Sequence, residues 1–99
     1  MDRGIYQIGR SLGVQKNYFI EYETYEQYVV KIAIPGESDV DNINVVMSNG
    51  TLKIRYPGNT FTEPFYYYFR IHKPIVADQT LAVLEDGILT VKMIKNLDN

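Results

Sequence analysis

The side chains in this sequence that could carry out catalysis are few and scattered. Of 99 residues one is a histidine, His72, and none is a cysteine. A Ser–His–Asp arrangement would depend on this single histidine, and Ser11, Ser38 and Ser48 lie outside any nucleophile-elbow pattern. A zinc site would need ligands other than the usual cysteines and paired histidines. We therefore expect no catalytic residue and no metal site, and we interpret His72 as a solvated turn residue.

Three alternating acids, Glu37, Asp39 and Asp41, have the spacing of calcium-loop ligands. An EF-hand loop also needs glycine at its sixth position and glutamate at its twelfth. Counted from Glu37, those positions hold Asn42 and Ser48. The segment is better interpreted as a charged turn that caps itself. Gly36, Gly50 and Gly58 stand singly at turns, so no phosphate-binding loop and no cofactor are expected.

Tyr66 and Tyr68, followed by Arg70, have the spacing of an aromatic row on a strand. Such rows can stack on the bases of single-stranded nucleic acid. However, 12 acidic residues outnumber 10 basic ones, the net charge is −2, and the sequence shows no basic groove. Sheet packing or a protein contact is the favoured interpretation. We expect neither nucleic acid nor an anionic membrane as a partner.

The composition suits one ordinary globular domain, since 45% of the residues are hydrophobic and 22% are charged. The absence of cysteine excludes a disulfide framework and fits a reducing cytosol. Residues 1–14 contain no apolar run of signal-peptide length, and no segment is long and apolar enough to span a bilayer. The expected location is the cytoplasm.

From residue 18 onward, apolar residues recur at every second position, which is the period of a strand. Phe19–Glu23 is predicted as a first strand. Tyr28–Ile34 is predicted as a second, with its even-numbered residues on one face. Pro35-Gly36 ends that strand, because proline cannot donate to a ladder and glycine permits the turn.

Two hairpins and one further strand complete the pattern. Each hairpin has a residue pair that suits a tight turn with positive φ at both central positions: Asn49-Gly50 between Ile43–Met47 and Thr51–Arg55, and Asp86-Gly87 between Leu81–Leu84 and Ile88–Met93. Between the hairpins, Phe65–Ile71 alternates in the same way. Seven to eight short strands with frequent turns predict an all-β, antiparallel sandwich.

The first seventeen residues are predicted to form a separate arm. Ile5, Ile8 and Leu12 fall at helical spacing, but intervening glycines weaken any helix, so the arm is either a frayed end or a docking segment. After Pro35-Gly36, Ser38 stands three residues before Asp41, a spacing typical of a helix cap. One short helical turn is predicted there.

Two parts of the sequence carry a family resemblance. Tyr28–Gly36 reads Tyr-Val-Val-Lys-Ile-Ala-Ile-Pro-Gly and precedes the hairpin that ends in Leu52-Lys53-Ile54, while Ala82–Leu89 reads Ala-Val-Leu-Glu-Asp-Gly-Ile-Leu. This order and spacing, over residues 25–95, resemble the α-crystallin domain of small heat-shock proteins. In that domain a strand ends in Leu-Pro-Gly and a later signature reads Ala-x-x-x-x-Gly-Val-Leu.

The resemblance implies an immunoglobulin-like sandwich over residues 18–95 that acts as an ATP-independent holdase. Such a chaperone binds partly unfolded client proteins and keeps them from aggregating, without an enzymatic reaction, as a stress-response protein. Binding of this kind asks for apolar surface and exposed strand edges. The residues expected in the core are Val30, Ile32, Ile34, Leu52, Ile54, Ala82, Leu84, Ile88 and Leu89.

The same resemblance suggests two contact surfaces. The groove expected to receive a client or partner lies between Ile43–Met47 and Leu81–Leu84, with Val45, Met47, Leu81 and Val83 as its residues. The edge expected to form a homodimer is Phe65–Ile71, with Tyr66, Tyr67, Tyr68 and Arg70 as its residues. Alternation defines two faces of each strand without saying which one points inward.

Departures from the family pattern limit the assembly. The segment from Tyr56 to Pro64 is much shorter than the loop through which many members swap a strand, so swapped dimerisation is not expected. The tail, residues 96–99, contains no Ile-x-Ile motif, so large cages are not expected. The related CS domain of co-chaperones also lacks the swapping strand, and it remains an alternative. So does a dedicated adaptor or structural protein built on the same sandwich.

Overall fold

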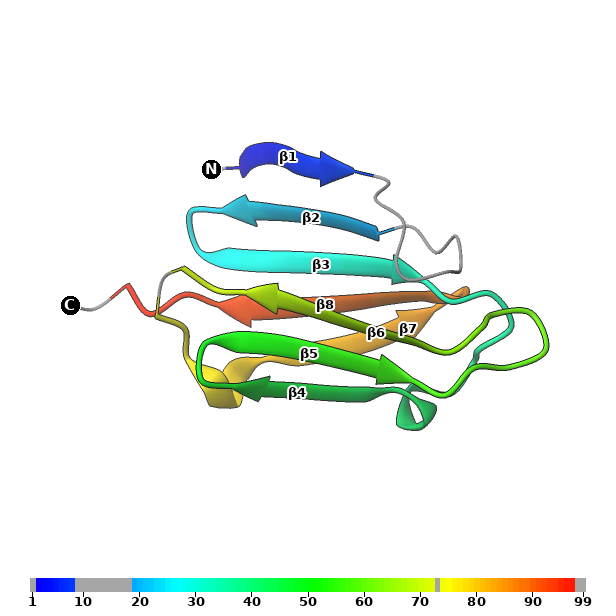
Figure 1. Ribbon diagram of the computed structural model, residues 1–99. Helices are drawn as coiled ribbons and strands as arrows, with labels where there is room; N and C mark the ends of the chain where they lie inside the picture. The colour runs from blue at the N-terminus through cyan, green and yellow to red at the C-terminus, as the bar shows by residue number, and fades with distance from the viewer. Residues whose placement is uncertain (1, 9–18, 73, 98–99) are drawn as a thin grey trace.

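Two antiparallel sheets make up the protein (Figure 1). The computed structural model describes residues 2–8, 19–72 and 74–97, the first range as backbone alone. The larger sheet has the strand order β1-β2-β3-β8-β7 and the smaller has the order β4-β5-β6. The elements, in chain order, are β1 Asp2–Ile8, β2 Phe19–Thr24, β3 Gln27–Ala33, the 3-10 helix η1 Val40–Asn42, β4 Asn44–Ser48, β5 Thr51–Tyr56, β6 Phe65–Arg70, the 3-10 helix η2 Ala77–Gln79, β7 Leu81–Glu85 and β8 Ile88–Ile94. The predicted all-β antiparallel sandwich is confirmed.

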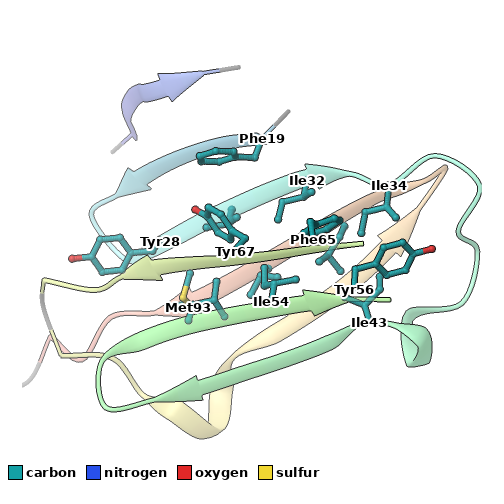
Figure 2. Close-up of a cluster of buried hydrophobic side chains, with 14 residues drawn as sticks. Phe19, Tyr28, Ile32, Ile34, Ile43, Ile54, Tyr56, Phe65, Tyr67 and Met93 are labelled. Atoms are coloured by element: carbon teal, nitrogen blue, oxygen red, sulfur yellow. The ribbon is translucent and has the colours of Figure 1, made fainter. Parts of the chain in front are cut away.

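The core lies between the inner faces of the two sheets (Figure 2). Alternate residues of the central strands turn inward and are completely buried: Val30 and Ile32 of β3, Leu52 and Ile54 of β5, and Leu89, Val91 and Met93 of β8. Each side chain of this size contributes about 1.5–3 kcal/mol when it leaves water. The period of two in the sequence therefore records which face of each strand is apolar.

Most residues predicted for the core lie there, with one error. Ala82 and Leu84 of β7 are partly buried and pack against the central cluster. Ile88 was predicted to be buried, but 44% of its surface is exposed. Because Leu89 follows the turn and faces inward, alternation directs Ile88 outward.

Both predicted hairpin turns have the backbone conformation that their sequences favour. In the first, φ is 52° at Asn49 and 74° at Gly50; in the second, it is 54° at Asp86 and 75° at Gly87. Asparagine, aspartate and glycine accept positive φ more readily than other residues. The second turn also supports β3, since the Ile34 N–H donates to the Gly87 carbonyl oxygen at 2.6 Å.

Two local predictions need adjustment. The helical turn after Pro35 is present as η1, but its cap is Asp39, whose side chain accepts from the Asp41 N–H, and not Ser38. Asp39 has the extended backbone that a cap requires, with φ −122°. The segment Asp2–Ile8, for which a weak helix was considered, is strand β1 and pairs antiparallel with β2. Leu12 lies outside the described residues.

Replacement of Gly87 by valine tests the second hairpin. A Cβ atom at this position would lie 3.5 Å from the nearest atom, the Ile34 carbonyl oxygen, so the cost comes from the positive φ and not from a clash. We expect Gly87→Val to lower the free energy of unfolding by about 1–3 kcal/mol, measured by urea denaturation. Gly87→Asn should retain most of the stability, because asparagine tolerates this conformation. A valine variant with an unchanged unfolding midpoint would contradict this account of the turn.

Candidate protein-binding edges

Strands β4 and β7 end their sheets on the side of the sandwich away from β1 (Figure 1). The inward side chains of β4 are Val45 and Met47, and those of β7 are Ala82 and Leu84. All four are only partly buried, although they pack against the core cluster. Two edge strands therefore carry apolar side chains that the sandwich itself does not cover completely.

The predicted groove residues lie on different faces: Val45 and Met47 of β4 pack against the core cluster, whereas Leu81 and Val83 of β7 do not. Ala82 is paired with Val91 and Leu84 with Leu89, and both partners are core residues. Cross-strand partners share a face, so Leu81 and Val83 must point to the opposite face of the larger sheet. They are 54% and 40% exposed, beside a hollow of about 220 Å³ that they line together with Lys31, Glu85, Thr90 and Lys92.

Strand β6 forms the other edge of the smaller sheet, and three of its four predicted edge residues point outward. Tyr66, Tyr68 and Arg70 are exposed. Tyr67 is only 3% exposed, and its ring lies 4.7 Å from that of Phe19 (Figure 2). It alternates with its neighbours in the strand and therefore belongs to the core. The side chain of Tyr67 is thus not available at the surface, contrary to the prediction.

The backbone of β6 has an unpaired side. Among the described strands, β5 alone neighbours it in the sheet. The Ile71 N–H donates to the Gly50 carbonyl oxygen at 2.8 Å. Hydrogen-bonded and non-hydrogen-bonded pairs alternate in an antiparallel ladder, so Tyr66, Tyr68 and Arg70 direct their backbone groups away from β5. These groups can bind another strand.

A cavity of about 300 Å³, not predicted from the sequence, lies where β2 and the end of β6 meet, and Glu21, Tyr22, Glu23, Tyr28, Phe69 and His72 line it. Beside it, Lys95 is 6% exposed and forms an ion pair with Glu23. The Lys95 Nζ also donates to the Thr24 carbonyl oxygen at 2.8 Å and lies 4.9 Å from the centre of the Tyr28 ring. The signal in the sequence was that Glu21 and Glu23 share the strand face of Phe19.

Comparison with solved structures identifies the architecture. Heat shock protein 16.0 from Schizosaccharomyces pombe superposes with a TM-score of 0.72 at 21% identity, over 82% of this chain and 67% of that one. A small heat-shock protein from Xylella fastidiosa gives 0.71 at 21% identity, over 90% and 92% of the two chains. HSP18.5 from E. histolytica gives 0.65 at 22% identity, over 80% and 86%. This is the α-crystallin fold of the small heat-shock proteins. No family model matches the sequence, and no curated protein is significantly similar to it.

In this α-crystallin fold, the segment between β5 and β6 is hydrogen-bonded to the turn after β3 of the same chain. Asn59 donates through Nδ2 to the Tyr56 hydroxyl at 2.8 Å and to the Pro35 carbonyl oxygen at 3.0 Å. Thr62, only 1% exposed, donates through Oγ1 to the same carbonyl oxygen at 2.7 Å. A Cβ atom on Gly36 would lie 2.6 Å from the Phe61 ring, so glycine permits this close approach. These contacts fix the short loop against the turn that follows β3.

The Glu37 carboxylate connects the same loop to η1. It accepts from the Tyr56 hydroxyl at 2.6 Å, from the Asp39 N–H at 3.0 Å and from Asn42 Nδ2 at 2.8 Å. The hydrogen bond from Tyr56, and next that from Asn42, hold the pKa of Glu37 below its ordinary value. Burial, with the neighbouring carboxylate, raises the pKa of Tyr56 to about 12. The acidic segment is therefore a turn that satisfies its own backbone groups.

Within residues 2–8, 19–72 and 74–97, no three His, Cys, Asp or Glu side chains are placed to hold a metal ion. The same residues contain no helix with the length and apolar character needed to cross a membrane.

The Glu37 hydrogen bonds predict a specific dependence of stability on pH. A carboxylate whose pKa is lowered by folding stabilises the protein above its unfolded pKa, and this stabilisation disappears as the pH falls through the folded value. We expect Glu37→Gln to reduce the free energy of unfolding near neutral pH, and the difference from the wild type to shrink as the pH falls through the lowered pKa of Glu37. Tyr56→Phe should raise the pKa of Glu37, so that the loss of stability on acidification begins at higher pH. If the difference in free energy of unfolding between the wild type and Glu37→Gln does not change with pH, the proposed role of the Glu37 carboxylate is contradicted.

Proposed function

We propose that this protein is an ATP-independent chaperone of the small heat-shock type, which binds partly unfolded proteins and prevents their aggregation. The proposal rests on one observation, the two edge strands β4 and β7. Together they carry four apolar side chains that pack against the core and are only partly buried. An unfolding protein offers apolar segments and unpaired backbone groups, and an open edge can bind both. No chemical step is needed, so the proposed activity is not enzymatic.

The client site proposed here is the surface of Val45, Met47, Ala82 and Leu84, termed the β4–β7 surface. Its residues are only partly buried, so a bound segment would complete the burial of each at about 25 cal/mol per Å² of apolar area. Leu81 and Val83 point to the other face of the sheet and are not part of it. Because the surface lies at an edge, binding would require no opening of the core.

The proposed assembly is a homodimer formed by antiparallel pairing of two β6 edges. The outward backbone groups of Tyr66, Tyr68 and Arg70 would then bind their counterparts in the second copy around a two-fold axis. The loop between β5 and β6 is fastened to Pro35, which argues against an exchange of this segment between subunits. We place this dimer in the cytoplasm, where a chain without cysteine needs no oxidising environment.

The second candidate function is a dedicated adaptor that binds one folded partner. It is favoured by the segment after β8, which is hydrogen-bonded to other parts of the same chain. The Lys95 N–H donates to the Glu26 carbonyl oxygen at 2.9 Å, and the Asn96 N–H donates to the Pro74 carbonyl oxygen at 2.9 Å. Ile94–Leu97 therefore does not extend as a free strand that could link dimers, as general holdases with large shells would need.

A light-scattering assay separates the two candidates. The purified protein should suppress aggregation of a destabilised model client at equimolar amounts or below, without nucleotide. No suppression at several-fold excess would favour the adaptor. Met47→Gln should weaken suppression several-fold, because it places a polar group on the β4–β7 surface, whereas Val83→Gln on the opposite face should not. If both variants lose suppression equally, with unchanged melting temperatures, the client binds at another site.

The dimer is tested by light scattering coupled to size-exclusion chromatography. The chain has a mass of 11.5 kDa, and we expect twice that value. Tyr68→Pro removes an N–H that points away from β5, so it should leave the monomer folded and yield the monomer mass. Tyr68→Phe keeps the N–H and should remain a dimer. A strict monomer in the wild type would favour the adaptor and the CS-domain mode, and a mass of a dozen or more subunits would refute the proposed assembly.

A further inference from the structure

The outer face of the smaller sheet gathers side chains that are far apart in the sequence. The strand register aligns three rows across β4, β5 and β6: Asn44, Arg55 and Tyr66; Val46, Lys53 and Tyr68; Ser48, Thr51 and Arg70. Partners in each row point the same way, opposite to the core residues of the same strands. These nine residues are termed the basic face.

The charge of the basic face is opposite to that of the whole chain. Lys53, Arg55 and Arg70 are exposed, and none of its nine positions is acidic. The chain as a whole has a net charge of −2. The negative net charge therefore does not exclude nucleic acid from this surface, because binding depends on the local field.

The basic face also exposes two aromatic rings that the core does not use. Tyr66 is 48% exposed and Tyr68 is 60% exposed, with ring centres 5.2 Å apart. The Arg55 guanidinium lies 5.0 Å from the centre of the Tyr66 ring. A hollow of about 510 Å³ runs along the rings and is lined by Thr51, Lys53, Tyr66, Tyr68 and Arg70.

We propose that the basic face binds single-stranded nucleic acid. Lys53 lies directly across from Tyr68 on β5, and Arg70 lies two residues along β6 on the same face. Both are placed to contact phosphates, while a base stacks on the Tyr68 ring or on the Arg55 plane. An acidic peptide would use the cations, but it has no flat ring to cover the exposed tyrosines. The charge and the two rings together therefore favour an unpaired polynucleotide over an acidic protein segment.

This activity is independent of the proposed client surface. The basic face spans β4, β5 and β6, but its β4 residues Asn44, Val46 and Ser48 alternate with Val45 and Met47, so none of the four residues of the β4–β7 surface belongs to it. If two β6 edges pair around a two-fold axis, the axis is perpendicular to the sheet, so the two basic faces become one continuous surface. A monomer would retain half of that surface and should bind more weakly, without losing specificity for single strands.

Fluorescence polarisation with a labelled oligothymidylate of about 12 nucleotides tests the proposal at low salt. The dependence of the logarithm of affinity on the logarithm of salt should have a slope of about −2 for three cations. Lys53→Gln and Arg70→Gln should each reduce that slope by about 0.7, while Lys92→Gln, an exposed lysine of the other sheet with the same change in charge, should not. Tyr68→Ala should weaken binding roughly ten-fold or more, and Tyr68→Phe should restore it.

Three outcomes would overturn the proposal. The first is no binding of the oligonucleotide by the folded wild-type protein at low salt. The second is an equal loss of affinity for the oligonucleotide in Lys53→Gln and Lys92→Gln, which would show a general charge effect. The third is that polyglutamate competes as effectively as unlabelled oligothymidylate and that Tyr68→Ala binds the labelled oligonucleotide as tightly as the wild type. This result would assign the basic face to acidic proteins. Circular dichroism of each variant should match the wild type, since all substituted side chains are exposed.

Discussion

The structure depends on the burial of alternate side chains from its three central strands. In β3, β5 and β8 the inward residues are aliphatic, Met and Tyr side chains with almost no exposed surface, and the largest contribution to stability comes from their removal from water. A shift of one residue in any register would place these side chains in solvent and polar ones in the core. The burial thus fixes the direction of every other side chain in the sheets, including those on the surface.

That constraint determines where the protein can interact. With the central strands paired on both sides, β1, β4, β6 and β7 are left with one paired side each among the described strands. The apolar residues of β4 and β7 lie at the sheet edges, where the sandwich covers them only in part. Of the aromatic residues of β6, Phe65 and Tyr67 lie in the core, while Tyr66 and Tyr68 are exposed. The loop after β5 is held by Asn59 and Thr62, so it does not cover these edges with a movable segment. Function is therefore proposed for edges and faces, and not for a pocket with reactive groups.

The sequence predicted the parts of the structure that depend on local chemistry. Asn49-Gly50 and Asp86-Gly87 form the expected turns because positive φ is a property of those residues themselves. Side-chain direction was harder to predict, because alternation alone does not say which face is inward. Leu81 and Val83 were predicted for the groove and Tyr67 for the dimer edge without a face being assigned, and only their partners across the sheet decide it. The basic face was missed because Lys53 and Tyr68 meet only through the pairing of β5 with β6.

Clients are proposed to bind at the free edges of β4 and β7, and not at the core or the loops. Hydrogen–deuterium exchange of the protein with and without a heat-destabilised client measures this directly. The amides of Asn44–Ser48 and Leu81–Glu85 should exchange more slowly when the client is bound, because their unpaired groups gain partners and their apolar side chains are covered. Unchanged exchange in both strands, with protection confined to other parts of the chain, would contradict the central claim.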